Sequence, residues 1–535
     1  MIKKPGRNAR AACRACAVPL LAAGLFLTAG CGGRRAPAAK HVIFFIGDGM
    51  SAESEVAASR YLYGRDDGLA WQSLPARAYV ATWDVTAYNT RARQARRPPY
   101  SRSSFDPAVG YSVKTYGARP LAGPGVLERF PSGPSTDSAS AATALATGFK
   151  TDSGNIAWLP GDPPGGGLTT ILEEVRARIG AAIGIISTVP FDHATPAAFV
   201  SHNPGRSAYY TGFKGYTGLG LADEIILKTK PDVVIGGGSP LIDNPDFDTR
   251  KGYISESLYR TLQTSQEYVF VERRPGQDGG AAVAEAAVRA AREGRKLFGL
   301  FGGKGGNFDV AQVEDSPGRP RVRPGSEENP SLAEAAEAAL GYLARDPQGF
   351  FLVIEQGDID WANHDNDYRA MIGAVADLDA AVRAALAYVD RPGDDVDWTN
   401  TVLLVTADHA TGGLLLEPGV TLAAGDLPRE TARADEHGLL PAKIGSDRGP
   451  ANGTAGKKPD YPSPYDYPDG DVSYGTAGHT NELVDLAVIG AAARDFLRLR
   501  GTWYPGPILD NTQINAALRE AVGLPRLGRQ ARRAD

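Results

Sequence analysis

Four short runs of hydrophobic residues stand out along the chain, and each is nearly free of polar positions. Such a run is typical of a strand buried on both faces, as in a parallel sheet. Glycines that mark strand ends follow two further candidates, at 232–235 and 297–301. The four main runs lie at 41–46, 181–187, 349–354 and 401–406.

Alanine-rich stretches between these runs have the composition and spacing of helices. They lie at 139–146, 281–293 and 370–389. Alternation of buried strands with helices predicts an α/β fold with a large, mainly parallel central sheet, flanked by helices on both faces and carrying loop insertions. No internal repeat is visible, so one large domain is favoured over a string of small ones.

Three stretches do not fit this alternation and are interpreted as insertions, near 84–135, 207–348 and 411–478. The first is polar and rich in Arg, Tyr, Gly and Pro, and it is expected to be irregular surface. The third is rich in Gly, Pro, Asp and Tyr, and it is expected near the mouth of the site. The catalytic domain is then 32–505, and 506–535 is a C-terminal tail with a basic end.

The first 31 residues have the features of an export signal, with a basic start and an apolar core too short to span a bilayer. Leu27 to Cys31 is similar to the lipobox of bacterial lipoproteins, so Cys31 is the expected lipidation site. The alternative is a plain secretory signal cleaved nearby. We therefore expect an exported protein, either periplasmic or anchored to a membrane through Cys31. The mature chain keeps only this cysteine and so has no intramolecular disulfide.

Side chains able to bind metal follow the predicted strands. Because open α/β sheets bind ligands at the carboxyl ends of their strands, these side chains are expected to meet there. Asp360 and His364 are four residues apart, which places both on one face of a helical turn and allows them to chelate one Zn²⁺. The alternative for this pair is a surface ion pair with no metal. The chain has only seven histidines, and four of them fall in these clusters. The metal-ligand candidates at strand ends are Asp48, Glu355, Asp408 and His409, and Asp360 and His364 share the helical turn. His479 comes at the end of the 411–478 segment. His193 and Thr195 lie close behind the strand at 181–187 and are candidate site residues.

Ser138 lies where the helix at 139–146 begins, and Gly148 is placed to end that helix. Backbone N–H groups at a helix N-terminus favour anions, which suits a serine that attacks a phosphoryl group. Taken alone, Asp137 or Ser138 could be no more than an N-cap. The net charge of −5 implies no general affinity for nucleic acid.

These motifs resemble those of the alkaline phosphatase family across nearly all of the mature chain, and they occur in the family's order. They are Ile-Gly-Asp-Gly-Met, Thr-Asp-Ser-Ala-Ser-Ala-Ala-Thr-Ala, His-Ala-Thr-Pro-Ala-Ala, Glu-Gln-Gly-Asp-Ile-Asp-Trp-Ala-Asn-His, Thr-Ala-Asp-His and Gly-His-Thr. The resemblance implies a phosphomonoester hydrolase that acts through a phosphoserine intermediate and releases inorganic phosphate and an alcohol. Because members of the family are often dimers, a homodimer is one candidate state.

By position, the resemblance implies two Zn²⁺ ions and one Mg²⁺ ion. The first zinc falls to Asp360, His364 and His479. The second falls to Asp48, Asp408 and His409, with Ser138 as a further ligand. Magnesium falls to Asp48, Thr195 and Glu355, whose oxygens suit a hard cation. Arg206 matches the arginine that binds the substrate phosphate.

The chain departs from the best-known bacterial member at two positions. His193 stands in place of an Asp, and Trp361 stands in place of a Lys. Both residues are candidates for contacts at the third metal site or with water near the phosphate. These changes bear on magnesium affinity and phosphate retention.

Three other interpretations compete with a phosphomonoesterase. A sulfatase would need Pro and Arg two and four residues after the nucleophile, where this chain has Ser140 and Ala142. A phosphodiesterase of the same superfamily usually has a Thr nucleophile and lacks the Arg206 and Mg²⁺ equivalents. A non-catalytic surface lipoprotein that binds phosphate or zinc would keep the ligands but would not need Ser138.

Overall fold

The computed structural model describes residues 39–111, 134–208, 218–240, 253–303, 305–416, 422–432 and 465–527. The predicted export signal, including Cys31, lies outside the described residues, so export and lipidation stay predictions. None of the helices in the described ranges combines the length and the apolar character that crossing a bilayer requires.

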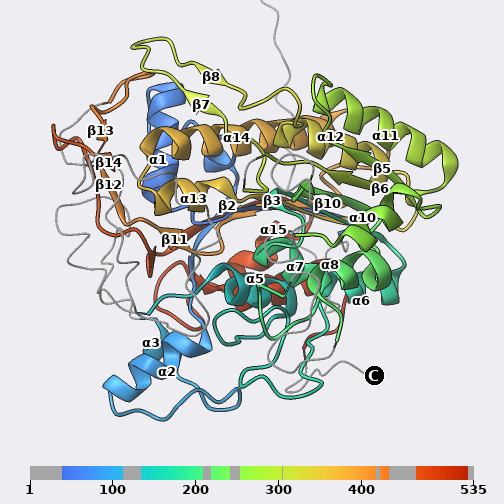
Figure 1. Ribbon diagram of the computed structural model, residues 1–535. Coiled ribbons are helices and arrows are strands. Elements are labelled where there is room, and N and C mark those ends of the chain that lie inside the picture. Colours follow the sequence, from blue (N-terminus) through green and yellow to red (C-terminus); the bar gives the residue numbers. More distant parts are fainter. Residues whose placement is uncertain are drawn as a thin grey trace, which may run out of the picture. The chain divides into compact units, whose positions relative to one another are not determined.

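A ten-stranded sheet forms the centre of the unit that spans residues 37–535 (Figure 1). Neighbouring strands are parallel except where β17 is inserted between β10 and β2. The central strands β1, β9, β10 and β3 are buried along their whole length. Across the sheet the order is β18 (Ile508–Asp510), β2 (Ala76–Ala81), β17 (Val484–Gly490), β10 (Thr401–Thr406), β1 (His41–Gly47), β9 (Phe350–Gln356), β3 (Ala182–Pro190), β4 (Val233–Gly237), β6 (Lys296–Leu300) and β5 (Tyr268–Glu272).

Helices cover both faces of the sheet, which confirms the predicted fold class (Figure 1). One layer holds α1 (Ala52–Tyr63), α11 (Gly279–Glu293), α12 (Leu332–Leu343), α13 (Asp358–His364) and α14 (Tyr368–Asp390). The other holds α5 (Ser138–Thr147), α6 (Ile171–Ile179), α7 (Ala194–Val200), α8 (Leu221–Glu224), which continues into η3 (Ile225–Thr229), α15 (Ala493–Arg498) and, packed on α5, α16 (Asn511–Ala521). Helix α10 (Glu256–Gln263) packs beside β5 and η1 (Ala70–Ser73) beside α14.

Helix α5 is buried along its whole length, and its sequence explains why. Asp137 caps its first turn, because its side chain accepts a hydrogen bond from Ser140 N (3.1 Å). Gly148 ends it in the left-handed conformation, with φ of 76°. The small alanine side chains in between allow α7 and α16 to pack closely against it.

Three expectations about the connecting segments need correction. Residues 84–111 are not irregular, because they form α2 (Val85–Gln94) and α3 (Pro107–Gly110) around the buried rings of Trp83, Tyr88 and Tyr111. The segment 207–348 is not an insertion, since it supplies three strands of the sheet (β4, β5 and β6). The segment after 505 is not only a tail, because β18 pairs with β2 and α16 packs on α5.

The segment 411–478 forms short two-stranded ladders in the parts that the structure describes. One of them matters for the site, since it pairs Thr411 with His479. The ladders are β11 (Ala410–Thr411) with β16 (His479–Thr480), β12 (Leu414–Leu416) with β15 (Val472–Tyr474), and β13 (Thr431–Ala432) with β14 (Tyr465–Asp466); a further pair, β7 (Gln312–Val313) with β8 (Val322–Arg323), lies earlier in the chain.

Candidate active site

The carboxyl ends of the central strands bring the predicted site residues to one edge of the sheet. Strand β1 lies between β9 and β10, and its Ile46 is opposite both Glu355 and Thr406. Asp48 follows Ile46 by two residues, and Asp408 follows Thr406 by two. The parallel register therefore places Asp48, Glu355 and Asp408 side by side, as the sequence predicts.

Ser138 is the first residue of α5 and is only 2% exposed. Its hydroxyl oxygen lies 3.2 Å from His409 Nε2 and 3.4 Å from Asp48 Oδ1. The helix N-terminus directs backbone N–H groups to the same place. A serine at a helix N-terminus is placed to attack an anionic centre held there, and a cation bound by the neighbouring ligands would favour its ionised form.

Asp48, Asp408 and His409 form the first group of potential metal ligands. One ligand atom from each lies within 4.8 Å of the other two, and all three residues are fully buried. His409 Nε2 is 3.4 Å from Asp48 Oδ1 and 3.3 Å from Asp408 Oδ2. Two carboxylates and one imidazole converging in this way suit Zn²⁺.

Asp360, His364 and His479 form the second group. His364 Nε2 lies 3.2 Å from Asp360 Oδ2 and 3.2 Å from His479 Nε2. Helix α13 supplies Asp360 and His364, while the β11–β16 ladder brings in His479 from more than a hundred residues away. The two groups adjoin, because the rings of His409 and His479 stack with centroids 3.7 Å apart.

Hydrogen bonds on the far side of the histidine rings fix their orientation. His364 Nδ1 donates to Ala477 O (2.7 Å), and His479 Nδ1 donates to Thr136 O (2.8 Å). Each Nε2 is therefore left as the lone-pair nitrogen that faces the cluster. Thr411, which the sequence gave no reason to select, donates through its hydroxyl to Asp360 Oδ1.

A third set consists of oxygens that are buried without hydrogen-bond partners. Asp48 Oδ2, Thr195 Oγ1 and Glu355 Oε1 are all in this state, although Ser187 donates to the other Glu355 oxygen. A buried carboxylate oxygen without a donor is costly, and a cation removes that cost. The donor set thus fits a hard cation such as Mg²⁺.

Burial first, and then the charges of neighbouring carboxylates, raise the pKa values of the carboxyl groups in the cluster. Burial, followed by the charges of Asp408 and Asp360, raises the pKa of Asp48 well above its usual range. Burial raises the pKa of Glu355 to about 8, and burial with the charge of Asp360 raises the pKa of Asp408 to about 7. Divalent cations at this place would offset the repulsion and keep these groups ionised.

Arg206 approaches the cluster from the side of Asp137. Its NH1 donates to Asp137 Oδ2 (2.9 Å), and its NH2 lies 3.4 Å from His193 Nε2. Burial would raise the pKa of Asp137, but the charge of Arg206 and hydrogen bonds from Ser140 and Gly154 hold it well below its usual range. Asp137 therefore serves both as the cap of α5 and as the residue that orients Arg206, a second role that the sequence did not reveal.

His193 and Trp361 lie together beside this pair, with ring centroids 6.0 Å apart. Burial and the charge of Arg206 lower the pKa of His193 to about 3, so its imidazole is neutral. His193 Nδ1 is buried without a hydrogen-bond partner. The structure thus places both departures from the best-known bacterial pattern next to Arg206 or to each other.

Position 49 requires a glycine, because α13 lies too close to its backbone to leave room for a side chain. Gly49 has φ of 68°, and a Cβ there would lie 2.6 Å from Asp360 Cα. Its N–H donates to Asp408 Oδ1 (3.1 Å). The second glycine of the Gly-Asp-Gly motif is therefore part of the site and is more than a turn residue.

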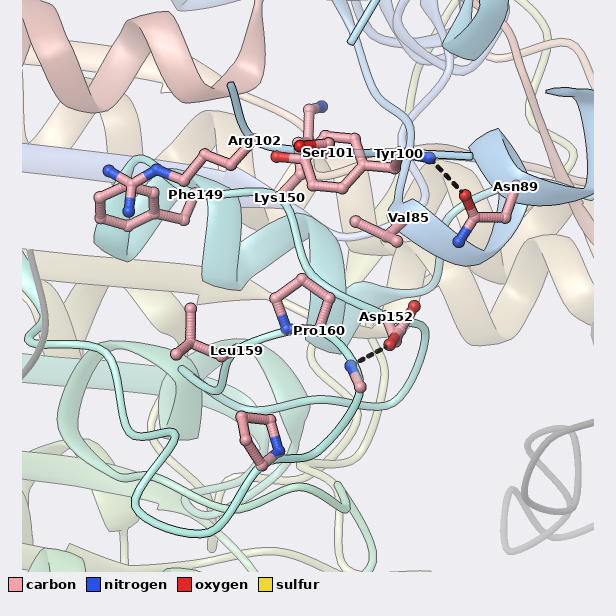
Figure 2. A pocket seen from close by; sticks show the side chains of 12 residues that line it. Val85, Asn89, Tyr100, Ser101, Arg102, Phe149, Lys150, Asp152, Leu159 and Pro160 are labelled. Atoms are coloured by element: carbon pink, nitrogen blue, oxygen red, sulfur yellow. Dashed lines mark hydrogen bonds between the residues drawn. The ribbon is translucent and has the colours of Figure 1, made fainter. Parts of the chain in front are cut away.

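A separate pocket of about 470 Å³ lies beside α2 and the loop that follows α5 (Figure 2). The guanidinium of Arg102 stacks 3.5 Å over the Phe149 ring on one side, and Leu159 and Pro160 lie on the other. Asp152, two residues before Gly154, closes one end. None of the predicted site residues lines this pocket.

Comparison with known proteins points to the same family as the motifs. The model of the family described as alkaline phosphatase matches residues 128–435, which is more than half of the chain. Alkaline phosphatase 4 of Bacillus subtilis is 30% identical over 281 residues, which cover 52% of this chain and 50% of that protein. Streptomycin-6-phosphate phosphatase of Streptomyces griseus is 28% identical over 524 residues, which cover 92% of each chain.

Among solved structures, a variant of the alkaline phosphatase of the Antarctic bacterium TAB5 has a TM-score of 0.53 at 18% identity, and the match covers 92% of this chain and 100% of that one. That similarity shows the fold. The match of the family model to more than half of the residues shows more, and it confirms the prediction made from the motifs: the chain belongs to the alkaline phosphatase family.

Proposed function

We propose that the protein hydrolyses phosphomonoesters, with Ser138 as the nucleophile and metal ions bound by the cluster around it. One observation carries the proposal. The buried Ser138 hydroxyl lies at the N-terminus of α5, within 3.4 Å of both Asp48 Oδ1 and His409 Nε2. A serine at a helix N-terminus between two metal-ligand candidates is suited to phosphoryl transfer.

The residues present fit two zinc ions and one magnesium ion. Asp360, His364 and His479 would hold one zinc, and Asp48, Asp408 and His409 the other. Asp48, Thr195 and Glu355 would hold magnesium through the oxygens that lack hydrogen-bond partners. Bound zinc would supply Lewis-acid chemistry that stabilises negative charge on the attacking and leaving oxygens.

The chain's own residues then carry out an in-line displacement. Ser138 Oγ forms a bond to phosphorus as the ester oxygen leaves with the alcohol, which gives phosphoserine. Water attacks the same phosphorus from the side that the alcohol left, which releases inorganic phosphate and restores Ser138. Arg206, oriented by Asp137, and the backbone N–H groups at the start of α5 bind the non-bridging oxygens.

A comparison of nitrophenyl phosphate monoester and diester substrates tests the reaction class directly. We expect the purified, metal-loaded protein to hydrolyse the monoester much faster and to lose this activity in a chelator. Preference for the diester would indicate a phosphodiesterase instead. The near full-length match to an enzyme named for streptomycin-6-phosphate supports including phosphorylated aminoglycosides in the panel.

Arg206→Ala is expected to weaken phosphate binding without abolishing turnover. Loss of a charge-assisted hydrogen bond costs about 1.5–3 kcal/mol, or roughly ten- to a hundredfold in affinity. The inhibition constant for inorganic phosphate is the measurement, with Arg260→Ala as control because that arginine forms only an exposed ion pair on α10. An inhibition constant equal to that of the control variant would contradict the assignment.

His193→Asp is expected to tighten magnesium binding by about tenfold, since residues beside a metal site change affinity by this order. The neutral imidazole adds no negative charge near Thr195 and Glu355, whereas a carboxylate does. A magnesium titration of activity at fixed zinc measures the effect, and the wild type should respond to millimolar magnesium and be inhibited by excess zinc. Superimposed curves for the two proteins would rule out a role for residue 193. A His-to-Asp variant of the TAB5 enzyme has been solved with Mg in its M3 site, which supports the experiment.

A further inference from the structure

A buried cluster of one histidine and two glutamates, His202 with Glu173 and Glu224, lies outside the metal site. It is formed by α6, α8 and the segment that follows α7. His202 is 1% exposed, and both of its ring nitrogens face oxygen atoms. Nδ1 lies 3.1 Å from Glu224 Oε1, and Nε2 lies 2.9 Å from Leu168 O and 3.2 Å from Glu173 Oε2. The backbone N–H of His202 also donates to Glu224 Oε2 (2.9 Å), so Glu224 binds both the ring and the chain.

The geometry requires an imidazolium. A neutral ring has one N–H, so one nitrogen would direct its lone pair at an oxygen that only accepts. Burial alone would lower the pKa of His202, but hydrogen bonds to Glu173 and Glu224 and their charges raise it to about 9. Lys228 Nζ also donates to Glu224 (2.9 Å), and the charged ring and this lysine lower the pKa of Glu224 to about 2 against the effect of burial.

A tightly bonded turn connects His202 to Arg206, four residues later. Asn203 exchanges two backbone hydrogen bonds of 2.9 Å with Ile156, and its side-chain oxygen accepts from Gly205 N (3.0 Å). Arg206 N donates to Gly154 O (2.8 Å), and Gly154 N donates in turn to Asp137 Oδ1 (3.0 Å). The backbone between His202 and Arg206 is therefore held by hydrogen bonds at Asn203, Gly205 and Arg206.

We propose that the Glu173–His202–Glu224 cluster fixes the turn that carries Arg206 and so sets where its guanidinium meets the substrate phosphate. His202 is a positioning residue, because it acts through Arg206 and touches no substrate. The proposal rests on the proposed function, in which Arg206 binds phosphate. Helix α6 supplies Glu173 and helix α8 supplies Glu224, and the turn itself follows the end of α7. Three helices therefore hold this one turn.

The test is a double-mutant cycle on the metal-loaded enzyme, read as the inhibition constant for inorganic phosphate. The variants are His202→Gln, Arg206→Ala and the double variant. Glutamine removes the charge and directs a carbonyl oxygen at an acceptor on one side. His41→Gln is the matched control, because His41 is equally buried but lies at the opposite end of β1 from Asp48.

In the wild-type background, His202→Gln should raise the inhibition constant by about tenfold and lower kcat less. In the Arg206→Ala background it should change the constant less than about twofold, because residues that act as a unit are not additive. Equal fold-changes in both backgrounds, or a His202→Gln variant that behaves like His41→Gln, would overturn the proposal.

The experiment also has to decide two other cases, a His202→Gln variant that does not fold and an inactive wild type. If His202→Gln lacks a cooperative unfolding transition, Glu173→Gln replaces it in the same cycle, since that side chain is 20% exposed and only one carboxylate is lost. A change of about threefold that disappears in the Arg206→Ala background would then support the proposal, and an unchanged constant would overturn it.

If the wild type neither releases phosphate from monoesters nor is inhibited by phosphate, the proposed function is wrong. If the wild type is active but the cycle is additive, only the role of His202 is wrong.

Discussion

Ser138→Ala is expected to lower kcat by at least about a thousandfold, since loss of a nucleophilic serine can lower kcat by about a millionfold. The hydroxyl is the only group lost, and its contacts are to Asp48 and His409. Alanine is also tolerated at the first position of a helix, so α5 should still form. Zinc content should stay close to that of the wild type, because the protein ligands of both groups remain. Some residual hydrolysis by direct attack of water is expected.

Thr147→Val is a suitable control, because it removes a buried hydroxyl from the other end of the same helix. That hydroxyl donates to Thr143 O within α5 and accepts from Phe149 N. The control should retain activity and metal. Wild-type turnover in Ser138→Ala would show that another group attacks phosphorus.

His479→Ala is expected to remove about one zinc ion per chain and to lower activity by a hundredfold or more, on the order reported for perturbed metal sites. The ring contributes Nε2 beside His364 and Asp360, while its Nδ1 is held by Thr136 O. High zinc should restore activity only in part, since the site keeps two of its three ligands.

Metal analysis of His479→Ala and His364→Ala beside His41→Gln measures this effect. Both ligand variants should lose the same zinc, whereas the control should keep the full content. Normal zinc content in His479→Ala would contradict the long-range assignment, and loss of zinc in the control would point to general destabilisation.

The sequence alone predicts those strands whose burial on both faces produces a continuous run of hydrophobic residues. The runs at 41–46 and 401–406 correspond to β1 and β10 within one residue, because a central parallel strand is buried on both faces and its interior positions are apolar. Strand β17 and helix α2 were not predicted from the sequence, because the burial of each depends on the elements that pack against it. Strand β17 is antiparallel between two strands of the sheet, and α2 is stabilised by rings packed around Trp83.

The site divides in the same way. Asp48, Glu355, Asp408 and His409 can be predicted because they lie at or just after the carboxyl ends of strands. Asp360 and His364 can be predicted because they share a helical turn. The pairing of Asp137 with Arg206, the Thr411 contact to Asp360 and the Glu173–His202–Glu224 cluster join residues that are 22 to 69 positions apart. Such pairs leave no local pattern in a single sequence, and only the folded chain reveals them.

The most direct test of the account is to identify the phosphorylated residue during turnover. The metal-loaded enzyme is incubated with a phosphomonoester, quenched in acid, digested and examined by mass spectrometry. We expect phosphate on Ser138 in the wild type and none in Ser138→Ala. Phosphate on a different residue, or steady turnover with no phosphorylated peptide under conditions that trap the intermediate, would contradict it.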